Sequence, residues 1–387
     1  MRSPTSRRGS GPPAALYARA GPGYGPRAPP PGGTLGSLTP PRAPSPSRSG
    51  DGERTSADGS RGAPGAVRIH GSGGPEVLRF EGIEVAEPAP GEARVRQRAV
   101  GVNFIDVYHR GGLYPLPRLP HGIGMEAAGV VEAVGSGVVG LRPGTRVAYA
   151  GGTPGSYAEV RNVPAGRLVP LPDGIDDRTA AATMLKGMTV EYLIRRAFRV
   201  EPGMTVLFHA AAGGTGLIAS QWLRRLGAIV IGTVGTEEKA ALARAHGCEH
   251  AIVYTREDFP ARVKEITAGR GVPVVYDSVG KATFEGSLAC LSRRGTLVSF
   301  GSASGPVPPL DPLELSRHGS LFFTRPRLQD YTASREELLA CASALFEVLQ
   351  SGAVRLVVGG TWPLREAADA HRALEGRRTT GSLLLLP

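Results

Sequence analysis

A run of small residues stands between an apolar strand and a helix in the middle of the chain. Positions 211 to 216 read Ala-Ala-Gly-Gly-Thr-Gly, after a strand predicted over Thr205–His209 and before a helix predicted over Gly216–Leu226. Small residues let a backbone approach a pyrophosphate, and the first turn of a helix offers it unpaired N–H groups. Because strand, turn, helix and a second strand all follow in order, the segment predicts a dinucleotide site rather than a bare tight turn.

The second strand of this unit ends without an acidic residue. An NAD site usually places Asp or Glu about 20 residues after the glycine turn, where it holds the ribose 2′-hydroxyl. Here residues 232–236 read Gly-Thr-Val-Gly-Thr, so a 2′-phosphate would meet no repulsion. Lys239 follows in the first turn of the next helix and could pair with that phosphate. The sequence therefore favours NADPH as the cofactor.

Strands and helices alternate through the second half of the chain, which predicts a doubly wound parallel sheet. Strands are expected over Thr205–His209, Ile229–Val234, Ile252–Tyr254, Val274–Asp277 and Thr296–Phe300. Helices are expected over Asp176–Arg196, Gly216–Leu226, Glu237–His246, Phe259–Thr267 and Phe284–Cys290. A helix over Arg335–Gln350, a strand over Ala353–Val358, a helix over Leu364–Leu374 and a strand over Ser382–Leu386 complete the pattern.

Short strands with dense Gly and Pro punctuation precede this region and predict a β-rich, barrel-like domain. They are expected over Ala66–His70, Val77–Phe80, Ala93–Val102, Ala127–Val134 and Arg146–Tyr149. In Ala93–Val102 apolar and polar residues alternate, which is typical of a half-buried strand.

Residues 1–65 differ in composition from the rest of the chain. They hold nine arginines against three acidic residues, so they carry +6 of the formal net charge of +11. Rich in Pro, Gly and Ser, they cannot bury enough apolar surface to fold, and we expect a disordered tail without catalytic role. Its arginines and serines resemble a transit peptide, but its proline runs oppose the amphipathic helix that import needs. A dispensable tail, or a start codon assigned too early, is the preferred interpretation.

Two classes of protein are excluded by composition. No stretch approaches 18 apolar residues, so no membrane span is expected. The three cysteines, Cys248, Cys290 and Cys341, are few and far apart, which excludes a disulfide framework and a four-cysteine zinc site. This cysteine usage suits a reducing compartment, and we expect a cytoplasmic location.

Residues 66–387 resemble the quinone oxidoreductases of the zeta-crystallin type, in the zinc-independent branch of the medium-chain dehydrogenase/reductase superfamily. The resemblance rests on GVNFIDVY at 101–108, GLYP at 112–115, LKGMTV at 185–190 and the stretch 208–222. VYDSVG at 275–280, SFG at 299–301, TRP at 324–326 and TGS at 380–382 add to it.

The resemblance implies an α/β fold with a co-chaperonin-like β-barrel catalytic domain and an inserted Rossmann-type domain. Residues 66–187 and 324–387 would form the barrel domain and residues 188–323 the Rossmann domain, with NADPH in the cleft between them. Asn103 and Tyr108 are the implied catalytic residues, with Tyr108 donating a hydrogen bond to substrate oxygen. The implied cofactor-binding residues are Asn103, Tyr108, Thr189, Gly213, Gly214, Thr215, Gly235, Lys239, Tyr254, Phe300, Ser302, Arg325 and Arg377.

No metal site is expected. Zinc alcohol dehydrogenases carry Cys-His where this chain has Asn103-Phe104, and Gly-His-Glu where it has Gly124-Met125-Glu126. Asn, Phe and Met do not replace the Cys and His ligands of tetrahedral zinc. Alcohol oxidation then lacks its Lewis acid, whereas a quinone is already electrophilic and needs only a hydride donor and a hydrogen-bond donor.

These observations predict an NADPH-dependent quinone reductase. An NADPH-dependent 2-alkenal or enone reductase is the alternative within the class, since both substrates are conjugated carbonyls. An RNA-binding or non-catalytic NADPH-binding protein is the alternative of another class, but the chain lacks an aromatic and basic platform for single strands. The resemblance also implies a homodimer, with an edge strand such as Thr296–Phe300 pairing across the interface.

Overall fold

The computed structural model describes residues 62–387, so all but the last four residues of the predicted tail lie outside the described part of the chain. The first strand, β1 (Gly65–Ile69), begins one residue before the predicted start of the folded region. No helix in residues 62–387 is both long and apolar enough to cross a membrane.

The barrel part is built on two sheets of mostly antiparallel strands. Its seven-stranded sheet runs β15-β16-β3-β5-β6-β8, with β7 paired to β3, and a smaller sheet runs β2-β1-β4. Alternate residues of β3 are buried from Ala93 to Gln97, whereas residues 99–102 are all buried, because Ala99 packs in a second core. The strands are β2 (Arg79–Gly82), β3 (Glu92–Val102), β4 (His121–Gly122), β5 (Glu126–Val134), β6 (Arg146–Ala150), β7 (Val160–Pro164), β8 (Val169–Pro170), β15 (Val358–Pro363) and β16 (Ser382–Leu386).

The second part is a six-stranded, wholly parallel sheet of order β11-β10-β9-β12-β13-β14. Its strands are β9 (Thr205–Phe208), β10 (Ile229–Val234), β11 (His250–Val253), β12 (Val272–Asp277), β13 (Leu291–Ser299) and β14 (Phe322–Thr324). The connecting helices are α3 (Gly214–Arg225), α4 (Glu237–Ala245), α5 (Phe259–Ile266), α6 (Phe284–Cys290) and α7 (Pro312–Arg317). The strand order reverses between β9 and β12, which is where doubly wound sheets bind ligands. The predicted fold class is confirmed.

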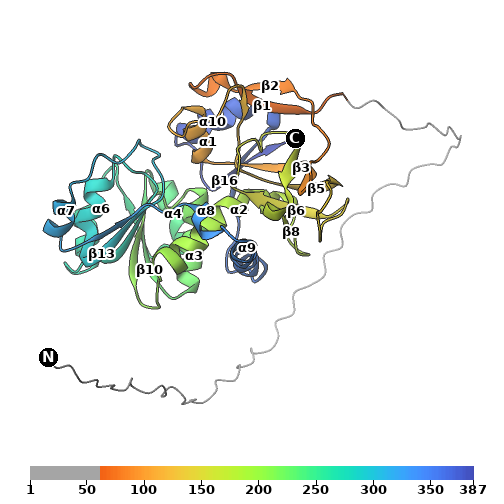
Figure 1. Cartoon of the computed structure of the whole chain (residues 1–387). Helices are drawn as coiled ribbons and strands as arrows, with labels where there is room; N and C mark the ends of the chain where they lie inside the picture. Colours follow the sequence, from red (N-terminus) through yellow and green to blue (C-terminus); the bar gives the residue numbers. More distant parts are fainter. Residues whose placement is uncertain (1–61) are drawn as a thin grey trace, which may run out of the picture. The chain divides into compact units, whose positions relative to one another are not determined.

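Helix α2 (Asp177–Tyr192) lies between the two sheets (Figure 1). Asp176 caps it by accepting a 2.9 Å hydrogen bond from the Thr179 backbone N–H. The helix is almost wholly buried, because it packs against β3, β5 and β6 on one side and α3 on the other. The predicted domain boundary after residue 187 falls inside α2, and the division of the chain into domains stays a prediction.

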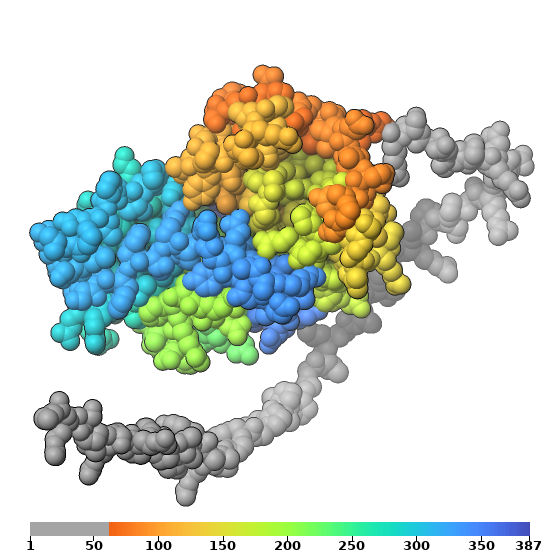
Figure 2. Space-filling view, viewed as in Figure 1, coloured from red at the N-terminus to blue at the C-terminus, as the bar shows by residue number. Residues whose placement is uncertain are grey.

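Three helices of residues 324–387 complete the contact between the two sheets. They are α8 (Leu328–Tyr331), α9 (Arg335–Gln350) and α10 (Ala367–Glu375). Helix α9 packs on α2, and in Figure 2 the blue residues of this segment lie against both the green and the yellow parts of the surface. The two sheets are thus held together by helices from two distant stretches of the chain.

Several predicted elements are corrected by the structure. The strand predicted over Ala353–Val358 is wrong, because the chain becomes extended only at β15, where β16 supplies a parallel partner. The strand predicted over Val77–Phe80 is split into a 3₁₀ turn over Pro75–Val77 and β2. Helix α1 (Phe104–Arg110) has no predicted counterpart.

The edge assignment of Thr296–Phe300 is also wrong. These residues overlap β13, which pairs with β12 on one side and β14 on the other. Strand β14 is therefore the edge of the sheet, and a partner strand cannot pair with β13.

Candidate active site

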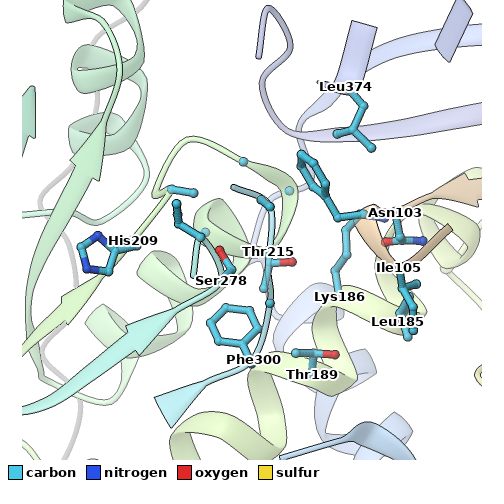
Figure 3. A pocket seen from close by; sticks show the side chains of 18 of the residues that line it. Asn103, Ile105, Leu185, Lys186, Thr189, His209, Thr215, Ser278, Phe300 and Leu374 are labelled. Atoms are coloured by element: carbon cyan, nitrogen blue, oxygen red, sulfur yellow. The ribbon is translucent and has the colours of Figure 1, made fainter. Parts of the chain in front are cut away.

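A cavity of about 830 Å³ lies between the two sheets, at the point where the strand order of the parallel sheet reverses. Its lining comes from α1 and α2 on the barrel side, and from the β9–α3 turn, the end of β10 and the loop after β13 on the other side. Figure 3 shows Lys186 beside Asn103, with Thr189, Thr215 and Phe300 around the same space. The cavity therefore joins the glycine turn to the segment around α1.

Backbone geometry shapes the glycine turn. A Cβ atom on Gly216 would lie 2.4 Å from the Ala210 carbonyl oxygen, so only glycine fits at that position. Gly213 precedes the first residue of α3 and has extended backbone angles, which leaves the first N–H groups of the helix directed at the cavity. The turn is tied to the barrel part, since Gly381 N–H donates a 3.0 Å hydrogen bond to the Ala212 carbonyl. This arrangement can hold an anionic pyrophosphate.

Basic and neutral groups surround the end of β10. Gly235, Lys239, Tyr254 and Arg377 line the cavity there, and none of them is acidic. The Lys239 ammonium donates a 2.6 Å hydrogen bond to the Arg377 carbonyl. Partial burial lowers the pKa of Lys239, and the nearby Arg377 charge lowers it further. An anion at this position would supply the lysine with the negative partner that it lacks.

The Tyr108 hydroxyl is held in a defined orientation on the barrel side. The Ser302 backbone N–H donates a 2.7 Å hydrogen bond to the Tyr108 oxygen, so the phenolic hydrogen is free to be donated to another group. Burial raises the pKa of Tyr108 to about 12. The hydroxyl is therefore protonated at neutral pH and can act as a hydrogen-bond donor into the cavity.

Arg325 organises the loop after β13 through hydrogen bonds to the protein itself. Its guanidinium donates to the Ser299 hydroxyl at 2.9 Å and to the Gly301 carbonyl at 2.7 Å. It also donates to the Tyr114 and Ser302 hydroxyls, both at 3.2 Å. Arg325 borders the cavity, but most of its donors are already used to hold this loop beside Tyr108.

The structure brings together all but one of the predicted site residues. Those at the cavity wall are Asn103, Tyr108, Thr189, Gly213, Gly214, Thr215, Gly235, Lys239, Tyr254, Phe300, Arg325 and Arg377. Ser302 is not part of the wall; it lies behind it, with its backbone on Tyr108 and its hydroxyl on Arg325. Their roles toward a bound molecule stay predictions.

Three buried charged residues beside the cavity have no predicted role from the sequence. Glu126 accepts a 2.6 Å hydrogen bond from Lys186 Nζ and a 2.8 Å hydrogen bond from Asn103 Nδ2. Asp106 accepts from the Asn103 backbone N–H at 2.8 Å and from the Tyr157 hydroxyl at 3.0 Å. Burial raises the pKa of Asp106 to about 7. Lys186 stands inside the LKGMTV motif, but no local pattern reveals its partner 60 residues away.

Metal ligands do not gather at the cavity. Within residues 62–387, no group of three or more His, Cys, Asp and Glu side chains is placed to hold a metal ion. Glu126 is occupied by Lys186 and Asn103, and Met125 is buried next to it. The absence of a metal site stays a prediction from the residue types.

A GroES-like barrel and a parallel sheet that meet at a glycine turn define a medium-chain dehydrogenase/reductase. Family models agree: an alcohol dehydrogenase GroES-like domain matches residues 89–173, and a zinc-binding dehydrogenase domain matches residues 214–347. The chain is 53% identical to a quinone oxidoreductase of Pseudomonas aeruginosa over 321 residues, covering 83% of this chain and 99% of that protein. The chain belongs to the quinone oxidoreductase family of this superfamily.

Two further similarities concern ligands and substrates of relatives. The crystal structure of Escherichia coli quinone oxidoreductase complexed with NADPH has a TM-score of 0.83 and 49% identity, covering 84% of this chain and 100% of that chain. A 2-haloacrylate reductase from a Burkholderia species is 47% identical, covering 83% of this chain and 98% of that protein. Both relatives match this chain over almost their entire lengths.

Proposed function

We propose that this protein is an NADPH-dependent quinone reductase. The observation that carries the proposal is one cavity with an acid-free, lysine-bearing end and, at the other end, a tyrosine hydroxyl whose hydrogen is free. The first feature suits a 2′-phosphate, and the second suits an oxygen that gains negative charge. The similarity to quinone oxidoreductases, one of them complexed with NADPH, supports the same assignment.

The residues around the cavity fit this cofactor. Gly213, Gly214 and Thr215 would hold the pyrophosphate at the first turn of α3. Gly235, Lys239, Tyr254 and Arg377 would surround the 2′-phosphate. Asn103, Tyr108, Thr189 and Phe300 would contact the nicotinamide, and Arg325 and Ser302 would hold the loop that carries Phe300.

The chemistry needs positioning and one hydrogen-bond donor. When bound, NADPH supplies a hydride from C4 of its nicotinamide. Tyr108 would donate its hydroxyl hydrogen to a carbonyl oxygen of the quinone and so stabilise the negative charge that develops there. The quinone takes up the hydride and one proton from water to give the hydroquinone. Tyr114 packs edge-on to Tyr108, with ring centroids 5.3 Å apart, and would shape the substrate end of the cavity.

Steady-state kinetics with purified protein would test the function. Rates with NADPH should be high for ortho- and para-quinones and low for 2-alkenals, and NADH should replace NADPH poorly. The similarity to a 2-haloacrylate reductase favours one second candidate, reduction of an activated C=C bond. A higher kcat/KM for 2-haloacrylate or 2-alkenals than for every quinone would replace our first choice with the second.

A homodimer formed through β14 is part of the proposal. This strand is the edge of the parallel sheet, and its Phe322 side chain is 62% exposed. Leu313, on the nearby α7, is 59% exposed. Pairing of two β14 strands would cover these side chains and give the backbone N–H and C=O groups of the edge strand hydrogen-bond partners. Sedimentation should give a dimer for the native protein and a monomer for Phe322→Glu; a native monomer would contradict the proposal.

Two other expectations remain predictions. The cytoplasmic location follows from the cysteine usage alone. Nucleic-acid binding is not expected of residues 66–387, and gel-shift titration with RNA across a salt series would detect it.

A further inference from the structure

Glu126 is a fully buried charge beside the cavity, and it accepts three hydrogen bonds. Its side chain has no exposed surface, at the start of β5. Lys186 Nζ and the Leu185 backbone N–H donate to it from α2, each at 2.6 Å, and Asn103 Nδ2 donates at 2.8 Å. The carboxylate therefore joins β5, α2 and the start of α1 at one point.

The carboxylate decides which way the Asn103 amide points. An ionised carboxylate only accepts hydrogen bonds, so the amide must present its NH₂ group to Glu126. The Asn103 backbone is fixed as well, since its N–H donates to Asp106 at 2.8 Å. Asn103 borders the cavity, and its side-chain oxygen closes a capping box with the Asp106 backbone at the start of α1. The second lone pair of this oxygen is left for a bound molecule. A ligand at this position must therefore offer a hydrogen-bond donor.

Lys186 is the cationic partner of Glu126, at 2.6 Å. Its side chain is 8% exposed, and its ammonium is the cation that compensates the buried carboxylate. Other titratable groups that face Glu126 are Asp106 on α1 and Tyr157, which interact with it at longer range. The stem of Lys186 also packs on the glycine turn, since a Cβ on Gly214 would lie 2.9 Å from Lys186 Cδ. Figure 3 shows Lys186 extending alongside Asn103.

We propose that Glu126 and Lys186 are a positioning pair that turns the Asn103 amide oxygen into the cavity, where it selects the carboxamide NH₂ of the nicotinamide. The inference rests on the proposed function, because it assumes that the nicotinamide binds beside Asn103. Neither residue needs to touch the substrate. Glu126 and Lys186 act through Asn103: they determine that the cofactor must carry a hydrogen-bond donor at this position.

A cofactor analogue measures this selection directly. In the 3-acetylpyridine analogue of NADP⁺, a methyl group replaces the carboxamide NH₂, so the analogue cannot donate to Asn103. Calorimetric titration of the native protein should show NADP⁺ binding about five- to tenfold more tightly than the analogue, the value of one buried hydrogen bond. In the double variant Glu126→Gln/Lys186→Met the amide is free to turn, and the preference should fall below about twofold.

Three further variants make the test specific. Glu126→Met alone removes the oxygen that accepts from Asn103 and should also reduce the preference, which covers the case in which the double variant does not fold. Glu191→Gln removes a second buried carboxylate of α2, paired with Arg196 at 2.7 Å and away from the cavity wall, and should keep the native preference. In an Asn103→Leu background, the double substitution should change the preference no further.

A folded Glu126→Met variant with the native preference for NADP⁺ would overturn the proposal. So would an equal loss of preference in Glu191→Gln, since the effect would then be a general loosening of α2. Failure of the proposed function is seen separately, as a native protein that binds neither NADP⁺ nor the analogue. The two failures therefore leave different results in the same titrations.

Discussion

The two walls of the cavity are built from different parts of the chain. On one wall, formed by residues 210–216 and called here the backbone wall, the shape comes from glycines without room for a Cβ and from the first turn of α3. On the other, called the side-chain wall, Asn103, Tyr108, Glu126 and Lys186 set the shape through buried hydrogen bonds. The first wall is a local motif, whereas the second exists only after distant segments have met. A single added side chain on the backbone wall should therefore abolish most cofactor binding. Single substitutions on the side-chain wall should each cause a smaller loss of function.

The largest effect is expected from Gly216→Val on the backbone wall. The new side chain would overlap the Ala210 carbonyl and the Ala211 backbone. Displacing this turn should weaken NADPH binding by more than about a hundredfold and lower the free energy of unfolding by about 1–3 kcal/mol. Gly71→Val is the matched control, because a Cβ there meets nothing within 4 Å. Fluorescence titration measures the NADPH affinity, and denaturant unfolding measures the stability. Tight NADPH binding by Gly216→Val would contradict the claim that the backbone wall has no room for a side chain.

Tyr108→Phe should reduce kcat by about a hundredfold, because it removes the hydrogen-bond donor to the quinone oxygen. NADPH affinity should change little, since the ring and its packing remain. Stopped-flow rates and cofactor titrations on the same protein separate the two effects. Tyr149→Phe, which loses a buried hydroxyl bonded to Gln97 away from the cavity, should keep the native rate. A loss of NADPH affinity without loss of kcat would show that Tyr108 binds the cofactor rather than the quinone oxygen.

Lys239→Glu should shift the cofactor preference by about thirtyfold toward NADH, because it places a like charge beside the 2′-phosphate. Binding of NADH, which has no such phosphate, should be nearly unchanged. Lys264→Glu, on the exposed side of α5, serves as the control for net charge. Equal losses for both cofactors in Lys239→Glu would refute the assignment of Lys239 to the phosphate.

The smallest effect concerns Asp106, behind the side-chain wall. Burial raises the pKa of its carboxyl to about 7, so the folded protein binds a proton that the unfolded chain releases near pH 4. Between these values the folded state binds more protons, and this residue lowers stability as the pH rises. Asp106→Asn should match the native protein near pH 5 and exceed its free energy of unfolding by about 1–2 kcal/mol near pH 8.

Urea unfolding of both proteins at the two pH values provides the measurement. Asp173→Asn, at an exposed aspartate, should show the same difference from the native protein at both pH values. If Asp106→Asn shows a pH-independent difference as well, the carboxyl is ionised in the folded state throughout this range.

The sequence predicts the backbone wall well, because its determinants are neighbours in the chain. The apolar residues of Ile229–Val234 and the small residues after Phe208 are sufficient to place a strand, a turn and the site. The prediction fails at β15, whose Gly359 and Gly360 have low strand propensity and which is extended because β16 pairs with it. It also misses α1, whose seven residues are too short for a periodic pattern to be distinctive.

The side-chain wall is predicted only in part. Asn103 and Tyr108 were expected at the cavity from the family resemblance, and both border it. Glu126 and Lys186 could not be paired from the sequence, because their contact depends on how α2 packs on β5. The sequence predicts Ser302 in the wall itself, whereas the structure shows that its backbone N–H donates to the Tyr108 hydroxyl. Any residue type could supply this N–H, so the sequence does not reveal the contact.

The position of β16 has a consequence for the order in which the protein is made. Strand β16 pairs with β3 through Val100–Val102, and Gly381, just before it, anchors the glycine turn. During synthesis this part of the β3 edge therefore stays unpaired until Ser382 and the residues after it have emerged from the ribosome, whereas β7 can pair with Glu92–Arg96 earlier. The parallel sheet can form earlier, from residues that all precede position 325. The nascent chain can thus form its nucleotide-binding sheet before β16 brings the two walls of the cavity together.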